Sequence, residues 1–264
     1  MPTTAGIITP VSLSNIICDK TRLVSIMLVN NEIGTIQPIK ELCTVAHANG
    51  TLFHTDAVQG VGHLKIDVQD LGIDMLSASA HKFNGPKGIG FLYIRRGTQI
   101  SSYADGGTQE FSRRAGTENV ASIVGMAAAL KGNCDCLDVH STSINMLEHQ
   151  LLNKLSAANI PYKRNGGEKT LPGLISLSFA GADAEAIYHR MDLAGICIAT
   201  GSACNSGSTE ISHVLKAISL NKEQAKGTIR ISLGKNNTKD DVEQIIHVLK
   251  IMDDEKNSKE LNAP

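Results

Sequence analysis

Short apolar runs of strand length alternate with helical patterns through the first hundred residues, and this alternation limits the fold more than any other feature. Leu23–Val29 is apolar almost throughout, which is typical of a strand buried on both faces of a parallel sheet. Pro38 suits the first turn of a helix that Gly50 closes. Further strands are predicted over 51–55, 75–79 and 89–94. Strands and helices in alternation predict an α/β fold with a mostly parallel sheet and flanking helices.

The pattern changes near Gly132, and the second half of the chain predicts a smaller α+β domain. Asp183 is expected to cap a helix that ends near Gly195. Other helices are expected over 144–155 and 240–252, with strands over 173–179 and 228–233 and a frayed tail from 253. We therefore expect two domains: residues 1–133 as part of a large domain, and residues 134–264 as a small domain.

Composition and charge argue against several classes of protein. The net charge of the 264 residues is −1 and aromatic residues make up 3%, so the sequence gives no indication of nucleic-acid binding. The sequence contains no apolar run that could span a bilayer and no signal-peptide pattern, so a cytoplasmic protein is expected. The 6 cysteines have neither the spacing of a disulfide scaffold nor that of a zinc site, so no metal is expected.

One lysine follows the predicted strand over 75–79. The stretch Ser79-Ala80-His81-Lys82 runs into a glycine-rich turn, so Lys82 is expected where a rigid strand opens toward a ligand crevice. A neutral amine at such a place is a nucleophile toward carbonyls, including the aldehyde of pyridoxal phosphate. A solvated loop lysine is the alternative, and Lys82 taken alone does not exclude it.

Polar residues also follow the other predicted strands. Asn31 follows the first strand, Asp56 and Gln59 follow the second, and Thr117 lies in a glycine-rich, basic loop before a helix. The carboxyl ends of parallel strands converge on one crevice. An aspartate there can hold the protonated ring nitrogen of pyridoxal phosphate. Asp56 can equally be a turn residue, and the loop around Thr117 can be a phosphate cradle or a plain exposed loop.

Two residues stand out in the second half of the chain. Cys204 lies between glycines amid small and polar residues, which suits a reactive thiol, whereas Cys197, in an apolar strand, fits a cysteine without a role. Arg230 lies mid-strand, with Ile229 and Ile231 pointing the other way, so its guanidinium can bind a carboxylate through two hydrogen bonds. A loop cysteine without a role and a salt bridge within the domain remain the alternatives.

Six motifs occur in a fixed order along the chain. They are Val29-Asn30-Asn31-Glu32-Ile33-Gly34, His54-Thr55-Asp56-Ala57-Val58-Gln59, Ser79-Ala80-His81-Lys82, Arg113-Arg114-Ala115-Gly116-Thr117-Glu118-Asn119, Gly201-Ser202-Ala203-Cys204 and Arg230-Ile231-Ser232-Leu233-Gly234. Together they resemble the cysteine desulfurases of the class V aminotransferase family, which serve iron–sulfur cluster assembly and nitrogenase maturation. The resemblance covers the chain from about Gly6 to Met252, and the loop around Cys204 is similar to the branch with an extended cysteine loop.

The resemblance implies pyridoxal 5'-phosphate as the cofactor and a role for each residue around it. Lys82 would bond to the cofactor's aldehyde and later move a proton of the substrate. Asp56 would pair with the ring nitrogen, and Gln59 with the phenolic oxygen. Ser79 and His81 would bind the phosphate. These residues are therefore expected to form one cofactor site.

The resemblance also implies a substrate and partners. Thr117 would reach the phosphate of the neighbouring subunit's cofactor, which implies a homodimer. Asn31 would contact the cofactor or the substrate, Arg230 would hold the carboxylate of L-cysteine, and Cys204 would attack its sulfur. The products would be L-alanine and a persulfide on Cys204, whose sulfur passes to an iron–sulfur scaffold or a thiolation enzyme.

The family pattern begins before this chain does, so we expect the usual N-terminal portion of the large domain to be missing. That portion supplies a glycine-alanine-threonine turn for the phosphate and a histidine that stacks on the ring, and His47, His54 and His63 do not replace it. We therefore expect the chain alone to bind the cofactor weakly and to turn over L-cysteine slowly. A non-catalytic binding subunit and another lyase or aminotransferase of this fold remain as alternatives, although Cys204 argues against the latter because transamination needs no thiol.

Overall fold

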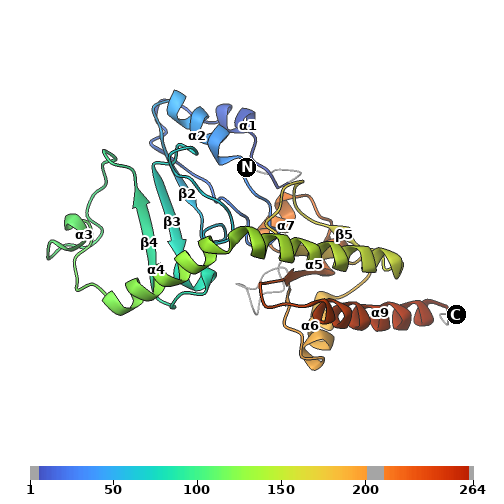
Figure 1. Ribbon diagram of the computed structural model, residues 1–264. Helices are drawn as coiled ribbons and strands as arrows, with labels where there is room; N and C mark the ends of the chain where they lie inside the picture. The colour runs from blue at the N-terminus through green and yellow to red at the C-terminus, as the bar shows by residue number, and fades with distance from the viewer. Residues whose placement is uncertain (1–5, 201–210, 262–264) are drawn as a thin grey trace. The chain divides into compact units, whose positions relative to one another are not determined.

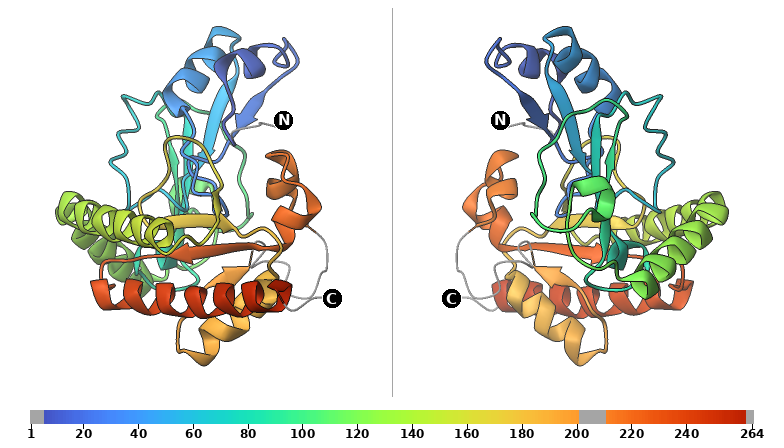
Figure 2. Two further views of the ribbon diagram at one scale, coloured as in Figure 1. Left: turned by 90° about the vertical axis from the view of Figure 1, so that its right-hand side faces the viewer. Right: turned by 90° about the vertical axis from the view of Figure 1, so that its left-hand side faces the viewer.

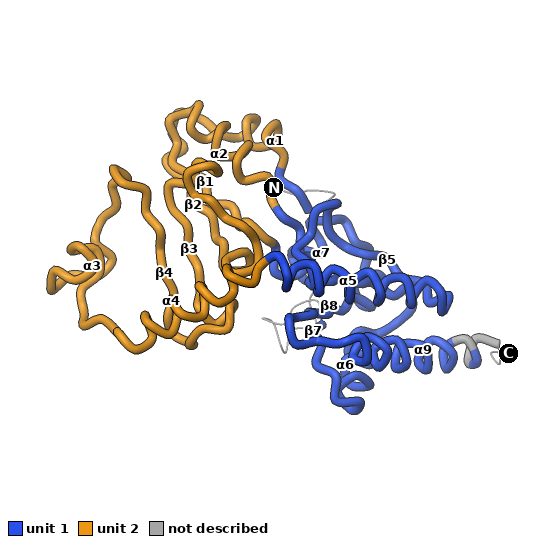
Figure 3. Tube along the Cα trace, viewed as in Figure 1, with its two compact units in different colours: residues 1–8, 30–36, 138–264 blue, residues 9–29, 37–137 orange. Residues whose placement is uncertain are grey.

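The computed structural model describes residues 6–200 and 211–261, and the chain divides into two compact units (Figure 3). Unit 1 comprises residues 1–8, 30–36 and 138–264, and unit 2 comprises residues 9–29 and 37–137. The units interleave along the chain, because the turn over residues 30–36 belongs to unit 1 while its neighbours on both sides belong to unit 2. The domain boundary between residues 133 and 134 stays a prediction.

Unit 2 is built on a four-stranded sheet of order β1-β2-β3-β4 (Figure 1). The strands are β1 (Leu23–Ser25), β2 (Leu52–Asp56), β3 (Met75–Ser79) and β4 (Gly90–Ile94). The helices are α1 (Pro10–Ser14), α2 (Ile39–Ala48), η1 (Ala80–Phe83), α3 (Gln109–Ser112) and α4 (Val120–Asp135). The first three strands are parallel and β4 is antiparallel to β3, which confirms the predicted α/β fold with a mostly parallel sheet.

The first strand is shorter than the apolar run that predicted it. The run extends to Val29, but β1 ends at Ser25. Beyond it, the N–H groups of Ile26 and Leu28 still donate to the carbonyls of His54 and Asp56, at 3.1 and 2.8 Å. The segment therefore continues beside β2 as irregular backbone. Val24, Ile26 and Leu28 are buried, but Leu23 and Met27 are exposed, so the expectation of a strand buried on both faces is wrong.

A buried carboxylate joins α2 to the sheet of unit 2. Asp74 accepts hydrogen bonds from the N–H of Phe53 at 2.8 Å and from Nε2 of His47 at 2.7 Å. The Arg95 guanidinium, just after β4, lies 3.4 Å from its other oxygen. Burying a carboxylate is costly unless it is hydrogen-bonded and paired, and Asp74 meets both conditions.

Replacing Asp74 by alanine should destabilise the chain strongly. The Asp74→Ala chain should lose about 3–5 kcal/mol of its free energy of unfolding, because Arg95 and the Phe53 N–H lose their common partner. Asp70→Ala is the control, since its exposed carboxylate pairs with Lys40 at the surface and should contribute less than about 1 kcal/mol. Denaturant titration followed by circular dichroism measures both, because the chain contains no tryptophan. Equal losses in the two variants would contradict this role for Asp74.

Unit 1 is built on an antiparallel sheet of order β5-β6-β8-β7. The strands are β5 (Lys163–Arg164), β6 (Leu174–Ser178), β7 (Ala199–Thr200) and β8 (Thr228–Ser232). The helices are α5 (Leu137–Ala157), α6 (Ala184–Leu193), α7 (His213–Ala217), α8 (Lys222–Lys226) and α9 (Lys239–Leu261). This arrangement confirms the predicted α+β character of the second half.

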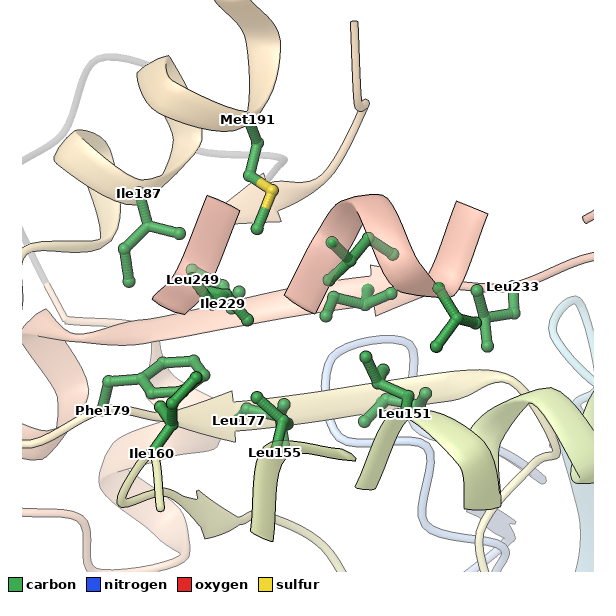
Figure 4. Close-up of a cluster of buried hydrophobic side chains, with 14 of the residues drawn as sticks. Leu151, Leu155, Ile160, Leu177, Phe179, Ile187, Met191, Ile229, Leu233 and Leu249 are labelled. Atoms are coloured by element: carbon green, nitrogen blue, oxygen red, sulfur yellow. The ribbon is translucent and has the colours of Figure 1, made fainter. Parts of the chain in front are cut away.

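One apolar cluster holds unit 1 together (Figure 4). Leu151 of α5, Met191 of α6 and Leu249 of α9 pack with Leu177 and Ile229 of the two central strands. The helix α9 runs lengthwise along the sheet in both views of Figure 2. The strand β8, which carries Arg230, is thus built on this cluster.

The C-terminal helix is longer than the sequence indicated. The tail from residue 253 was predicted to fray, but α9 continues to Leu261. Glu255 accepts two hydrogen bonds from Arg190 of α6, and Lys256 donates to the carbonyl of Ala180 at 2.9 Å, which accounts for the extension. Asp183 caps α6 as predicted, accepting the N–H of Glu185 at 3.0 Å.

Within the described ranges, no helix by itself is both long and apolar enough to cross a bilayer. The helices α4 and α5 meet the requirements of length and composition only when the two are taken together across the break between them.

Candidate functional site

Lys82 lies in η1, directly after the end of β3. The turn is closed by hydrogen bonds from the Ala80 N–H to the Ile89 carbonyl at 3.0 Å and from the Gly85 N–H to the Ala80 carbonyl at 2.8 Å. Asn84 ends the turn with a left-handed backbone at φ 65°. The Lys82 side chain is exposed. The predicted position of Lys82, between a strand and a glycine-rich turn, is therefore confirmed.

Two distant side chains hold the backbone of this turn. Nε2 of His63 donates to the carbonyl of Lys82 at 2.8 Å, so this ring nitrogen carries the proton, because a carbonyl oxygen only accepts. The buried Asn133 of α4 donates to the carbonyl of Phe83 at 2.6 Å. The Phe83 side chain is fully buried. Lys82 is thus an exposed amine on an anchored backbone.

The other candidates of unit 2 lie at the ends of β2 and β3, which are parallel neighbours. A hydrogen bond of 2.8 Å joins Oγ of Ser79 to Nδ1 of His81. Asp56 is exposed at the end of β2, and its Oδ1 accepts the N–H of Val58 at 2.9 Å. This contact is the turn role that the sequence left open, and none of the described residues donates to Oδ2. Gln59 is half-buried in the turn that follows.

The charge of Asp56 also acts on a histidine of the same strand. Burial lowers the pKa of His54, and the carboxylate of Asp56 acts in the opposite direction. His54 and Asp56 are two positions apart on β2 and therefore share one face of the sheet. Nδ1 of His54 forms a hydrogen bond of 2.8 Å with Oγ of Ser25 on β1. This face thus carries a histidine that tends to stay uncharged beside an exposed carboxylate.

The residues of unit 2 fit pyridoxal 5'-phosphate by their chemistry. This cofactor needs an amine for its aldehyde, an acidic partner for its ring nitrogen and hydrogen-bond donors for its phosphate. The ends of β2 and β3 supply the amine of Lys82, the carboxylate of Asp56, the hydroxyl of Ser79 and the imidazole of His81. Asp56 also retains a carboxylate oxygen that none of the described residues donates to. The donor set is therefore suitable for the cofactor.

Asn31 lies in a tight turn that belongs to unit 1. Oδ1 of Asn30 accepts the N–H groups of Glu32 and Ile33, at 2.9 and 3.1 Å. Gly34 has φ 72°, and a Cβ at this position would lie 2.8 Å from the carbonyl oxygen of Leu174, so only glycine fits here. The N–H of Leu171 donates to the carbonyl of Gly34 at 2.8 Å, so the turn is attached to the segment that precedes β6.

The structure brings Arg230 and Asn31 together within unit 1. Arg230 lies in the middle of β8, and its Nη1 donates to the carbonyl of Asn31 at 2.9 Å. Ile229 and Ile231 are buried on the opposite face, as the alternation predicted. Arg230 forms no ion pair with a carboxylate of the described residues, so the salt bridge considered from the sequence is not found there. Burial raises the pKa of the Glu32 carboxyl, and the charge of Arg230 nevertheless acts to lower it.

Cys204, Thr117 and Cys197 are the remaining residues that the sequence singled out. Cys204 lies outside the described residues. Thr117 is exposed in the loop before α4. Cys197, expected to have no role and to lie in an apolar strand, is exposed and precedes β7, so its expected place in a strand is wrong. Its apolar neighbours Ile196 and Ile198 pack against the core cluster and account for the misleading pattern.

A cavity of about 770 Å³ lies elsewhere in unit 1, between α6 and α9. Ile187, Leu193 and Leu249 line it together with the ion pair of Arg190 and Glu255. None of the candidate residues lines this cavity. Its position therefore adds nothing to the chemistry of Lys82 or Arg230.

The chain is similar to known proteins over nearly all of its length. The family described as "Aminotransferase class-V" matches residues 1–245. "Cysteine desulfurase IscS" of Clostridium botulinum is 43% identical over 247 residues, which are 92% of this chain and 62% of that protein. The chain thus spans about 62% of the length of this curated relative.

Solved structures resemble the chain in fold. A NifS-like protein from Rickettsia africae has a TM-score of 0.86 and 32% identity, covering 96% of this chain and 68% of that one. The structure described as "SspA in complex with cysteine" has a TM-score of 0.74 and 34% identity, covering 90% of this chain and 66% of that one.

Proposed function

Because the chain belongs to the class V aminotransferase family, we propose that it is a pyridoxal 5'-phosphate-dependent cysteine desulfurase. Its similarity to a protein named cysteine desulfurase over most of this chain supports the activity. The observation that carries the proposal is the placement of Lys82, an exposed amine on an anchored backbone at the ends of two parallel strands. Asp56 and Ser79 lie at the same strand ends and supply the partners that this cofactor requires.

The proposed reaction converts L-cysteine into L-alanine. The carbon–sulfur bond of the substrate breaks and a sulfur–sulfur bond forms with the thiol of Cys204, which becomes a persulfide. The substrate β-carbon is reduced to a methyl group while the sulfur is oxidised, so the reaction needs no external oxidant. Each turnover leaves one sulfur atom on Cys204 and releases one L-alanine.

The residues of unit 2 would hold the cofactor and move protons. When bound, the cofactor withdraws electrons from the substrate α-carbon, which makes its proton acidic. Lys82 takes this proton as a general base, and its anchored backbone keeps the amine at a constant position. The carboxylate of Asp56 holds the ring nitrogen protonated, and Gln59 donates to the phenolic oxygen. Ser79 and His81 bind the phosphate.

The residues of unit 1 would bind and attack the substrate. Arg230 binds the carboxylate of L-cysteine with the guanidinium N–H groups that Asn31 does not occupy. The side chain of Asn31 contacts the substrate or the cofactor. The thiolate of Cys204 attacks the substrate sulfur, because the thiolate is the nucleophilic form of cysteine.

Replacing Arg230 by lysine should weaken substrate binding more than catalysis. The Arg230→Lys chain should show a KM for L-cysteine about tenfold to a hundredfold higher, because lysine cannot bind a carboxylate and the Asn31 carbonyl in the fixed geometry of a guanidinium. Arg190→Lys is the control, because Arg190 forms an exposed ion pair with Glu255 and has no role in the proposed reaction. Steady-state kinetics measures both, and an unchanged KM in Arg230→Lys would contradict the assignment.

The partners are part of the proposal. Thr117, exposed in its loop, would bind the phosphate in a second copy of the chain, so the active form would be a homodimer. The persulfide of Cys204 would pass its sulfur to an iron–sulfur scaffold or a thiolation enzyme by thiol exchange. The cytoplasmic location expected from the sequence stays a prediction.

Product identity tests the proposed function. The chain is incubated with pyridoxal 5'-phosphate, L-cysteine and a thiol reductant, and L-alanine and sulfide should appear in equal amounts. Pyruvate with ammonia would indicate a lyase instead, and a 2-keto acid formed only with an amino acceptor would indicate an aminotransferase. Bound cofactor without any product would favour the non-catalytic binding subunit.

A further inference from the structure

One carboxylate next to Asn31 has no assigned role. The side chain of Glu32 accepts a hydrogen bond from the hydroxyl of Ser212, with an Oγ–Oε2 distance of 2.6 Å. Burial raises the pKa of Glu32, while the Ser212 hydroxyl and the cationic forms of His213 and Arg230 lower it. Glu32 thus lies among the residues that surround Arg230.

Ser212 serves two segments of unit 1 at once. It is buried, and its Oγ accepts the N–H of Val214 at 3.1 Å, which caps α7. The same hydroxyl donates its proton to Glu32, so it acts as a donor and as an acceptor at once. Val214 also packs with Ile33 in one apolar cluster. The turn over residues 30–36 and α7 are therefore joined by a polar and an apolar contact.

This contact continues to Arg230 through the backbone. Nη1 of Arg230 donates to the carbonyl of Asn31, and the peptide bond of that carbonyl leads directly to Glu32. The hydrogen bond from Ser212 restrains Glu32, and Glu32 in turn restrains the carbonyl to which the guanidinium is attached. The Glu32 carboxylate is thus half-buried, accepts from Ser212, and adjoins the carbonyl that accepts from Arg230.

We propose that Glu32 is a positioning residue, which together with Ser212 fixes the Asn31 carbonyl and through it the orientation of Arg230 toward the substrate carboxylate. This inference rests on the proposed function, because it assigns Arg230 to the carboxylate of L-cysteine. Glu32 itself does not touch the reacting atoms. Its effect is therefore on substrate binding rather than on the chemical steps.

Kinetics of paired variants tests the inference. Glu32→Ala and Ser212→Ala should each raise the KM for L-cysteine about tenfold with kcat changed less than about twofold, and the double variant should be no worse than either. Glu32→Gln keeps an acceptor for Ser212 and should restore KM to within about twofold of the unchanged chain. Glu168→Ala, an exposed glutamate of unit 1, is the control. Additive effects on KM, a loss confined to kcat, or no rescue by Glu32→Gln would overturn the proposal.

Amide hydrogen exchange tests the same contact without turnover. Ser212→Ala should speed exchange at Ile33 and Gly34 about tenfold, and leave the amides of Ile229 and Ile231 in β8 unchanged. Unchanged exchange at Ile33 and Gly34 would overturn the coupling, whether or not the chain is active. If Ser212→Ala speeds exchange but leaves the KM for L-cysteine unchanged, the contact of Glu32 is only structural. That result would overturn its positioning role.

The two proposals fail separately in these experiments. If Ser212→Ala speeds amide exchange but the unchanged chain produces no L-alanine, the proposed function is wrong. The contact between Glu32 and Ser212 is still supported in that case. If that chain still binds L-alanine, the dissociation constant measured by calorimetry takes the place of KM in the same set of variants. If the chain binds neither L-cysteine nor L-alanine, Arg230 has no substrate carboxylate to bind, and both proposals are wrong.

Discussion

The Cys204→Ala chain should form no persulfide and should release sulfide at least about a thousandfold more slowly than the unchanged chain, because the reaction loses its nucleophile. Binding of pyridoxal 5'-phosphate should be unaffected, since Cys204 is not among the proposed cofactor contacts. Sulfide release under reductant and the absorbance of the bound cofactor measure the two effects separately. Cofactor binding without sulfur transfer is therefore the expected result.

Cys197→Ala is the matched control for this variant. Cys197 is exposed and precedes β7 in unit 1, so its thiol is accessible to solvent but has no role in the proposed reaction. Its replacement should leave sulfide release within about twofold of the unchanged chain. Sulfide release that survives in Cys204→Ala, or that is lost in Cys197→Ala, would mean that the nucleophile is wrongly assigned.

The Lys82→Ala chain should lose turnover by at least about a thousandfold, because one side chain both bonds to the cofactor and transfers the substrate proton. Lys87→Ala is the control, since Lys87 is an exposed lysine of the same glycine-rich stretch. Borohydride reduction followed by mass spectrometry of the peptides should find the cofactor on Lys82 in the unchanged chain and on no lysine in the variant.

The outcome that contradicts the assignment of Lys82 is equally specific. Covalent cofactor on another lysine of the unchanged chain would move the site away from β3. Turnover retained in Lys82→Ala but lost in Lys87→Ala would exchange the roles of the two lysines. Stability of both variants should match that of the unchanged chain, because both side chains are exposed and carry no hydrogen bond in the described residues.

The parts of the site that depend on local pattern could be predicted from the sequence. Asp56 and Lys82 follow strands whose apolar residues and following turns are contiguous in the chain. Arg230 alternates with two isoleucines, and this period of two is enough to place it on the opposite face of β8. Asp183 was recognised as a helix cap because capping requires only a few neighbouring residues.

The contacts that hold these residues could not be predicted in the same way. His63 reaches the Lys82 carbonyl across 19 residues of sequence, and Asn133 reaches that of Phe83 across 50. The contacts of Ser212 with Glu32 and of Arg230 with Asn31 span 180 and 199 residues. Such pairs meet only through the tertiary fold, and no spacing in the sequence indicates them.

Two errors in reading single segments have similar causes. The tail after residue 252 is rich in charged residues and looks frayed in sequence, but contacts from Glu255 and Lys256 to α6 and the loop before it support α9. The apolar run Leu23–Val29 predicted a strand buried on both faces, but β1 ends at Ser25, and Leu23 and Met27 are exposed. Burial and hydrogen bonding by distant partners, which a local pattern does not contain, decided both cases.

The chain offers internal controls for locating the transferred sulfur. A hydrogen bond from Thr21 lowers the pKa of the exposed Cys18, so Cys18 is the control thiol most inclined to ionise. Burial raises the pKa of Cys43 to about 12, so its thiol should remain inert. Cys134, Cys136 and Cys197 are exposed. Non-specific sulfur would therefore appear first on Cys18 and the other exposed thiols.

The most direct test of the account is a single turnover with L-cysteine that carries sulfur-34, in the presence of pyridoxal 5'-phosphate. Peptide mass spectrometry then locates the heavy sulfur, and L-alanine is counted in the same sample. The account predicts one heavy sulfur atom on the peptide of Cys204 for each L-alanine formed, with Cys18 unlabelled. Heavy sulfur spread over the exposed cysteines, or L-alanine formed without any label on Cys204, would contradict it.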